Sequence, residues 1–266
     1  MIQLKSPQEI QRLQESADLV SNVMNRMLKM AKPGLPTIEL DEMAEKTIRS
    51  YGARPAFKGY RGFPFSVCVS VNEQVVHGFP SRKPLKEGDV LSLDVGVIYQ
   101  GYVGDCARTI GIGVVAAEAD LLIRRSYYAL QQACKATRIG NRLHDVSHTV
   151  ESIAARYGYG VVRDFVGHGV GREMHEDPQV PNFGKPGTGP RLKTGLVIAI
   201  EPMFNLGTYE VETLDDKWTV VTKDRKISAH VEDMVAVLPE GPKILSSADG
   251  MILPPIEEMN SLAVSA

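Results

Sequence analysis

The segment VLSLDVGVIYQGYVGDCART, residues 90–109, decides the fold. In an extended chain, side chains two residues apart share a face, and here one face carries Leu91, Leu93, Val95, Val97 and Tyr99. This period of two predicts a β-strand over residues 90–99. Gln100 and Gly101 offer a turn, and the residues from Tyr102 onward predict a returning strand. The segment is therefore a candidate β-hairpin.

Two carboxylates lie on the same face of this hairpin. If the turn has two residues, Asp94 lies opposite Ala107 and diagonal to Asp105, at a backbone distance of about 7–8 Å. Ionised carboxylates held this close in a folded interior repel each other, and one would stay protonated. A bound cation removes the conflict, whereas an isolated pair of surface aspartates would be the ordinary alternative.

The composition is that of an ordinary globular chain. The 266 residues are 43% hydrophobic and 23% charged, and 30 basic against 32 acidic residues give a net charge of −2. This balance favours neither nucleic acid nor a membrane surface as a partner, and no signal core or run of 18 apolar residues occurs. Three widely spaced cysteines, Cys68, Cys106 and Cys134, favour a reducing cytoplasm over a disulfide framework.

The order of expected elements repeats along the chain. Helices are expected at residues 6–33, 37–52, 117–137 and 141–157, with strands at 66–71, 75–77 and 160–167. Residues 85–94 align with 192–201 through the shared pattern L-K-x-G, a mostly apolar strand and a final carboxylate. The repeat predicts one catalytic domain, residues 1–245, with halves at about 6–115 and 116–245. Residues 246–266 are expected to form a C-terminal surface extension.

Further ionisable side chains lie at strand ends or in glycine-rich segments. Glu201 ends the apolar strand VIAIEP, where an isolated ionised glutamate would be costly to bury. Glu232 lies in a second alternating strand, and His168 lies in Gly-His-Gly-Val-Gly, where glycines let the backbone approach a site closely. Each of these residues alone is more often structural than functional. Together with Asp94 and Asp105 they form a set of four carboxylates and one imidazole.

Several ordered motifs carry a resemblance to a known family: Ser70-Val71-Asn72-Glu73, Val76-His77-Gly78, Asp94-Val95-Gly96, Gly104-Asp105-Cys106-Ala107-Arg108-Thr109, Gly167-His168-Gly169-Val170-Gly171, Met174-His175-Glu176-Asp177-Pro178, Ile200-Glu201-Pro202 and Ser228-Ala229-His230-Val231-Glu232. With these motifs the chain resembles the type I methionine aminopeptidases, from about Ser6 to Leu245. The resemblance implies the α+β pita-bread fold. In that fold, a pseudo-two-fold repeat of helices packs on a curved antiparallel β-sheet, with a metal site in the central cleft.

The resemblance implies a centre of two divalent metal ions. The implied ligands are Asp94, Asp105, His168, Glu201 and Glu232, of which Asp105 and Glu232 would bridge the ions. An oxygen-rich set with one imidazole suits Co, Mn, Fe or Zn. Two divalent ions also balance four carboxylates, which resolves the repulsion expected within the hairpin.

The resemblance also assigns catalytic and substrate-binding residues. His175 would donate a hydrogen bond to the scissile carbonyl, His77 would contact the substrate amide, and Glu201 would act as general base. The expected methionine pocket consists of Phe57, Tyr60, Phe63, Cys68, Met174 and Trp218. Phe57, Phe63 and Met174 depart from residues that are common in the family. The alternative for these aromatic residues is an ordinary role in the core.

The implied activity is removal of the initiator methionine from nascent polypeptides with a small second residue. A cytoplasmic monomer close to the ribosome is expected. Two alternatives remain open: a proline-directed aminopeptidase of the same fold, and a metal-free binding module. His144 and His148, four residues apart on an expected helix, resemble a zinc motif only faintly because the glutamate of that motif is replaced by Asp145.

Overall fold

The computed structural model describes residues 1–246. Its longest strands are β4 (Val90–Tyr99) and β5 (Tyr102–Gly111), which pair along their whole length. Gln100 and Gly101 form the two-residue turn between them with φ angles of 49° and 82°. Positive φ at both central residues is what a type I′ hairpin turn requires. The predicted hairpin is therefore confirmed.

This hairpin belongs to a nine-stranded sheet with the order β1-β4-β5-β14-β9-β7-β8, in which β2 also pairs with β4 and β15 with β14. Every recorded pairing in it is antiparallel. The remaining strands are β1 (Arg54–Pro55), β2 (Val67–Val71), β7 (Gly167–Gly169), β8 (Glu176–Val180), β9 (Val197–Ile200), β14 (Glu232–Leu238) and β15 (Gly241–Ile244).

Two three-stranded sheets complete the strands of the described residues. One has the order β13-β10-β6 and the other β11-β12-β3. Their strands are β3 (Gln74–Val76), β6 (Gly160–Val161), β10 (Met203–Asn205), β11 (Val211–Thr213), β12 (Val220–Thr222) and β13 (Ser228–His230). The expectation of one strand over 160–167 is wrong, because β6 and β7 belong to different sheets. The residues between them form a loop that lines a cavity.

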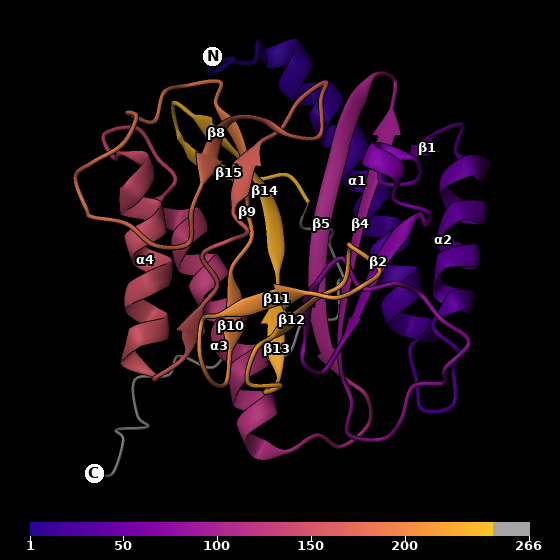
Figure 1. Cartoon of the computed structure of the whole chain (residues 1–266). Helices are drawn as coiled ribbons and strands as arrows, with labels where there is room; N and C mark the ends of the chain where they lie inside the picture. Colours follow the sequence, from indigo (N-terminus) through magenta and orange to yellow (C-terminus); the bar gives the residue numbers. More distant parts are fainter. Residues whose placement is uncertain (247–266) are drawn as a thin grey trace.

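Within residues 1–246, four α-helices cover the sheet in two pairs: α1 (Pro7–Met30), α2 (Ile38–Ser50), α3 (Ala117–Ala136) and α4 (Leu143–Arg156). The first pair lies on the side of β4 and β5, and the second lies on the side of β9 and β14 (Figure 1). Helix α1 begins with a capping box, because Ser6 accepts from the backbone of Glu9 while the Glu9 carboxylate accepts from the backbone of Ser6. None of the helices in residues 1–246 has the length and apolarity needed to cross a membrane.

Each helix pair buries its apolar face against its own part of the sheet. Met24 and Leu40 belong to the same core cluster as Leu93 of β4. Leu130 and Val146 belong to a second cluster, which includes Val235 of β14. Fully burying a side chain of this size contributes about 1.5–3 kcal/mol. The two cores hold the centre of the sheet between them, where β5 pairs with β14.

A buried ion pair lies behind this central pairing. The Arg108 guanidinium is 1% exposed and donates to the Asp233 carboxylate at 2.6 Å and to the backbone carbonyl of Ser246 at 3.3 Å. The Ser246 hydroxyl donates to the same carboxylate at 2.8 Å. Ser246 is therefore buried, which contradicts the predicted surface extension at its first residue. Residues 247–266 lie outside the described residues, so the remainder of that prediction is untested.

Candidate active site

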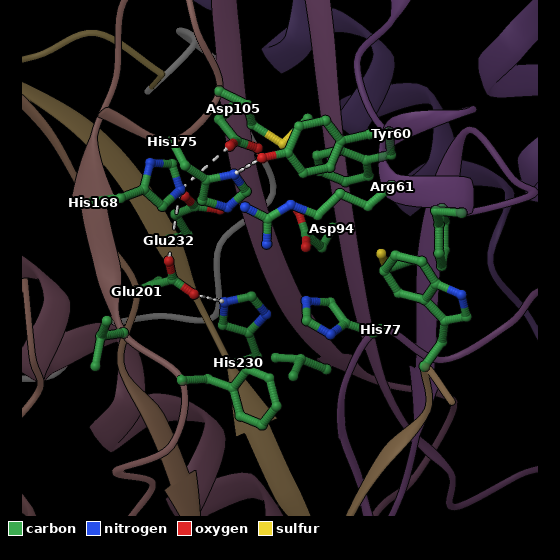
Figure 2. A pocket seen from close by; sticks show the side chains of 18 of the residues that line it. Tyr60, Arg61, His77, Asp94, Asp105, His168, His175, Glu201, His230 and Glu232 are labelled. Carbon is green, nitrogen blue, oxygen red and sulfur yellow. Dashed lines mark hydrogen bonds and ion pairs between the residues drawn. The ribbon is translucent and has the colours of Figure 1, made fainter. Parts of the chain in front are cut away.

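A cavity of about 350 Å³ opens where the two helix-covered halves of the sheet meet (Figure 2). Its lining includes every residue that the sequence predicted for the site: Phe57, Tyr60, Phe63, Cys68, His77, Asp94, Asp105, His168, Met174, His175, Glu201, Trp218 and Glu232. These residues come from both halves of the chain and from strands and loops that lie far apart in the sequence. The structure therefore brings together the complete predicted set.

Strand register places the carboxylates on one face. Asp94 pairs with Ala107, and Ala107 pairs with Glu232 on the next strand, so the three form one row across the sheet. Directly opposite residues point to the same side. Asp105 lies two residues from Ala107 and shares that side. Because the central position of the row is alanine, its short side chain leaves room between the carboxylates.

The same register brings in the second half of the chain. Met234 lies two residues from Glu232 and pairs with Ala199, which in turn pairs with His168. Glu201 lies two residues after Ala199 and follows the end of β9. All five predicted ligands thus project from one face by the period of two alone. Ala199, which lies between Met234 and His168, is a second small residue on this face.

The resulting cluster is compact. One ligand atom from each of Asp105, His168 and Glu232 lies within 4.8 Å of the others, and all three residues are buried. His168 Nε2 lies 3.9 Å from Asp105 Oδ2 and 3.8 Å from Glu201 Oε1. Its Nδ1 donates to the carbonyl of Gly169 at 2.9 Å, which leaves Nε2 as an acceptor facing the carboxylates. This tautomer suits an imidazole that binds a metal.

Burial disfavours the charged forms of the carboxylates. It raises the pKa of Asp94 to about 7, and it raises the pKa values of Asp105 and Glu232 well above their ordinary range, with neighbouring carboxylates adding to both. Asp94 Oδ1 and Asp105 Oδ1 are buried without a hydrogen-bond partner. Oxygen ligands with unused lone pairs, one oriented imidazole and excess negative charge fit a divalent metal ion.

Two further histidines project into the cavity. The His175 ring lies 4.3 Å from that of His168, and its Nδ1 is 2.9 Å from the Tyr60 hydroxyl. His77 lies edge-on to Phe165 and to Trp218. Burial lowers the pKa of both histidines to about 4. Both rings are therefore neutral at pH 7, and each can donate one hydrogen bond.

An aromatic slot lies beside the metal-binding face. The Phe63 ring meets that of Trp218 in a T-shaped contact at 5.1 Å, and Phe57, Cys68 and Met174 are buried in the same core cluster. Burial raises the pKa of the Cys68 thiol well above its ordinary value, so the thiol stays protonated and packs as an apolar group. This chemistry suits a flexible apolar side chain.

Several lining residues were not predicted as site residues: Arg61, Val76, Asp164, Phe165, Val166, Gln179 and His230. His230 had a signal in the sequence, since it lies two residues before Glu232, and its Nε2 is 3.5 Å from Glu201 Oε2. Arg61 lies between two glycines in Gly59-Tyr60-Arg61-Gly62, which permits an unusual backbone but does not reveal a cavity.

The His144–His148 pair has no metal-binding arrangement. His144 Nδ1 lies 2.8 Å from the Thr188 hydroxyl, and its ring packs against Gly184 and Gly189. In residues 1–246, the only recorded candidate group of metal ligands is that of Asp105, His168 and Glu232. These contacts are consistent with the faint resemblance of the pair to a zinc motif.

Comparison with known proteins identifies the family of this chain. The model of metallopeptidase family M24 matches residues 11–239. A methionine aminopeptidase of Clostridium perfringens is 49% identical over 246 residues, covering 92% of this chain and 99% of the relative. The crystal structure of methionine aminopeptidase from Thermotoga maritima superposes with a TM-score of 0.92 at 41% identity, covering 93% of this chain and all of that chain. These matches confirm the predicted pita-bread fold.

Prolidase from Pyrococcus horikoshii shares the fold more distantly. Its structure gives a TM-score of 0.76 at 24% identity, and the match covers 94% of this chain but 65% of the prolidase. That likeness concerns the fold alone, whereas the methionine aminopeptidases match at far higher identity over nearly their full length. The chain belongs to the methionine aminopeptidases of metallopeptidase family M24.

Proposed function

We propose that this chain hydrolyses the peptide bond after an N-terminal methionine in polypeptides whose second residue is small. The observation that carries the proposal is one cavity in which a metal-binding face of buried carboxylates and a histidine adjoins an aromatic slot. The family relationship supports the same reaction. N-termini of nascent polypeptides are the proposed substrates, and a cytoplasmic monomer near ribosomes is the proposed setting.

The proposed cofactor is a pair of divalent ions, with Co, Mn, Fe or Zn as candidates. Asp94, Asp105, His168, Glu201 and Glu232 would hold them. When bound, such ions lower the pKa of a water molecule and polarise a carbonyl. Two divalent ions would also balance the charge of the four carboxylates, and burial opposes the ionisation of three of them, Asp94, Asp105 and Glu232.

The protein's own side chains supply orientation and proton transfer. Glu201 would take the proton from the attacking water and deliver it to the leaving amine. If the Tyr60 hydroxyl donates to His175 Nδ1, Nε2–H remains free to donate to the scissile carbonyl. One donor of this kind is commonly worth about 3 kcal/mol in the transition state. His77 would orient the substrate amide from the other side of the cavity.

Methionine selectivity would come from the aromatic slot. Phe63 and Trp218 form its apolar wall, and contacts between the thioether sulfur and their rings would contribute up to about 1 kcal/mol. Gly96 helps to form the slot, because a Cβ at this position would lie 2.7 Å from Phe57 Cε1. The ring can therefore approach the strand closely.

A peptide panel tests the proposal. Metal-stripped protein is reloaded with Mn, Fe, Co or Zn, elemental analysis gives the metal content, and release of methionine is measured from Met-X-Ser with X varied from Gly to Leu. We expect release to fall as X grows. Glu201→Gln should abolish turnover, whereas His144→Gln, a change on the helix far from the carboxylates, should retain it.

Each rival has a distinct outcome. Release of residues next to proline, without release of methionine from Met-Ala-Ser, would favour a proline-directed enzyme. Absence of any bound divalent ion under every loading condition would favour a metal-free binding module. Either result would reject the proposal.

A further inference from the structure

We infer that Arg61 is a specificity residue that binds a carboxylate on the third residue of the substrate, so that N-termini of the type methionine–small–acidic are preferred. The inference rests on the proposed function and adds a charge preference to it. It starts from the backbone at Arg61, the absence of an ion pair to it within residues 1–246 and its position relative to His175.

The backbone at Arg61 is unusual. Arg61 lies in the short 3₁₀ turn η1 (Tyr60–Gly62) with φ 48° and ψ 23°, between Gly59 at φ 87° and Gly62 at φ 91°. A non-glycine residue with positive φ is uncommon and costs of order 1 kcal/mol or more. Such conformations cluster at functional sites, where the surrounding structure holds them. Here the turn directs a long cationic side chain into the cavity (Figure 2).

The guanidinium has no carboxylate partner recorded within residues 1–246. Its Cζ lies 5.3 Å from the centre of the Tyr60 ring, and the residue is exposed. A guanidinium carries five donors and no acceptor and stays charged, so it pairs with acceptor oxygens, and a carboxylate is the acceptor that its planar fork binds most strongly. The four carboxylates of the metal-binding face would be occupied by metal ions in the active protein, and the remaining acidic residue of the lining, Asp164, has no ion pair with Arg61 among the contacts of residues 1–246. An anion supplied by the substrate is then the complementary group.

The position of Arg61 indicates which substrate residue it meets. Tyr60 bonds to His175 and stacks on it with ring centres 5.4 Å apart, and Arg61 directly follows Tyr60 in the chain. Since His175 is proposed to face the scissile carbonyl, Arg61 adjoins the part of the peptide near that bond and beyond it. An extended chain advances about 3.3 Å per residue. The second residue is small, so the third is the first that can carry a carboxylate.

The test compares Met-Ala-X-Ser peptides with X as Glu, Gln or Lys. We expect wild-type protein to cleave the Glu peptide with a kcat/KM about two- to fivefold above that of the Gln peptide at low ionic strength, the range for a solvent-exposed ion pair. Arg61→Gln should bring the ratio to about one, Arg61→Lys should retain part of it, and Arg61→Glu should favour the Lys peptide. In 1 M salt the wild-type ratio should shrink, because the screening length falls to about 3 Å.

Two control variants isolate the effect. Arg26→Gln removes an exposed arginine from α1 and makes the same change in net charge, so it should leave the ratio as in wild type. Asp164→Asn removes a cavity residue of opposite charge and should not lower the ratio. A drop in Arg26→Gln would assign the preference to overall charge, and a drop in Asp164→Asn would assign it to another group of the cavity; either result would overturn the inference.

The outcomes separate this inference from the proposed function. If Arg61→Gln cleaves the Gln peptide and keeps the wild-type ratio, Arg61 does not read the third residue. If the variant loses activity equally on all three peptides, Arg61 binds the main chain and the charge preference is wrong. If wild-type protein releases methionine from none of the peptides under any metal loading, the proposed function fails, and the inference fails with it.

Discussion

Replacing Asp94 with asparagine should stabilise the metal-free protein at alkaline pH. The folded state keeps the Asp94 carboxyl protonated up to a pKa of about 7, whereas its ordinary value is 3.8. Between these values the folded state binds more protons than the unfolded state, so stability falls as pH rises. Asparagine cannot ionise and escapes this loss. A residue proposed to bind metal would thus destabilise the fold when metal is absent.

The size of the effect follows from the two pKa values. Each pH step between them changes the free energy of unfolding by about 1.4 kcal/mol, so moving from pH 5 to pH 8 would cost the wild-type protein about 3 kcal/mol. Because Asp94 is partly exposed, solvent screening reduces the expected loss to about 2 kcal/mol. The lowered pKa values of His77 and His175 act in the opposite direction, because they reduce stability as pH falls from 6.5 towards 4. That contribution is common to both proteins and cancels.

Urea unfolding of EDTA-treated protein measures the difference. The variant should gain about 2 kcal/mol on wild type between pH 5 and pH 8. Asp215→Asn, a change at an exposed position, serves as the control and should show no such gain. Adding Mn²⁺ should then stabilise wild type more than Asp94→Asn, because binding to the folded state alone adds about 2.7 kcal/mol at 100 times the Kd. A gain that does not change with pH would refute the electrostatic account.

Two other substitutions probe how His175 is held. The Lys5 ammonium and the Glu176 carboxylate form a buried ion pair beside His175, so Lys5→Met should lower the free energy of unfolding by about 3 kcal/mol. Adding Glu176→Gln to this variant should restore part of the loss. Urea denaturation of both variants checks this, and equal stability of Lys5→Met and wild type would contradict it. Tyr60→Phe removes the hydroxyl bonded to His175 and should lower kcat about fivefold while the metal content stays the same. Steady-state kinetics measures kcat and elemental analysis measures the metal. A loss of metal in this variant would instead assign Tyr60 to metal binding.

Local patterns were sufficient to predict the central hairpin and its chemistry. Alternation over residues 90–99 and a two-residue turn define the register, and that register alone places Asp94 and Asp105 on one face. The start of α1, expected at residue 6, is likewise set locally, because the capping box there joins residues three apart in sequence. Predictions of this kind succeed because the deciding contacts are short-range.

Long-range contacts explain what the sequence did not reveal. Nothing near Ser246 indicates that its hydroxyl and carbonyl are buried against Asp233 and Arg108, since that burial depends on a residue 138 positions away. The strand expected at 160–167 failed because β6 pairs with β10 while β7 pairs with β9. The conformation of Arg61 also escaped prediction, because nothing in the local sequence marks an arginine for positive φ.

The row Asp94–Ala107–Glu232 links folding to metal binding. The β5 and β14 strands must pair for this row to exist, yet their pairing brings together carboxylates whose charged forms burial opposes. Apolar packing of the two helix layers supplies the free energy that holds them there without metal. A divalent ion then removes the repulsion that packing has imposed, so binding should be strongest to the fully formed sheet. Metal affinity should therefore weaken in variants that loosen the β5–β14 pairing, even when every ligand remains in the sequence.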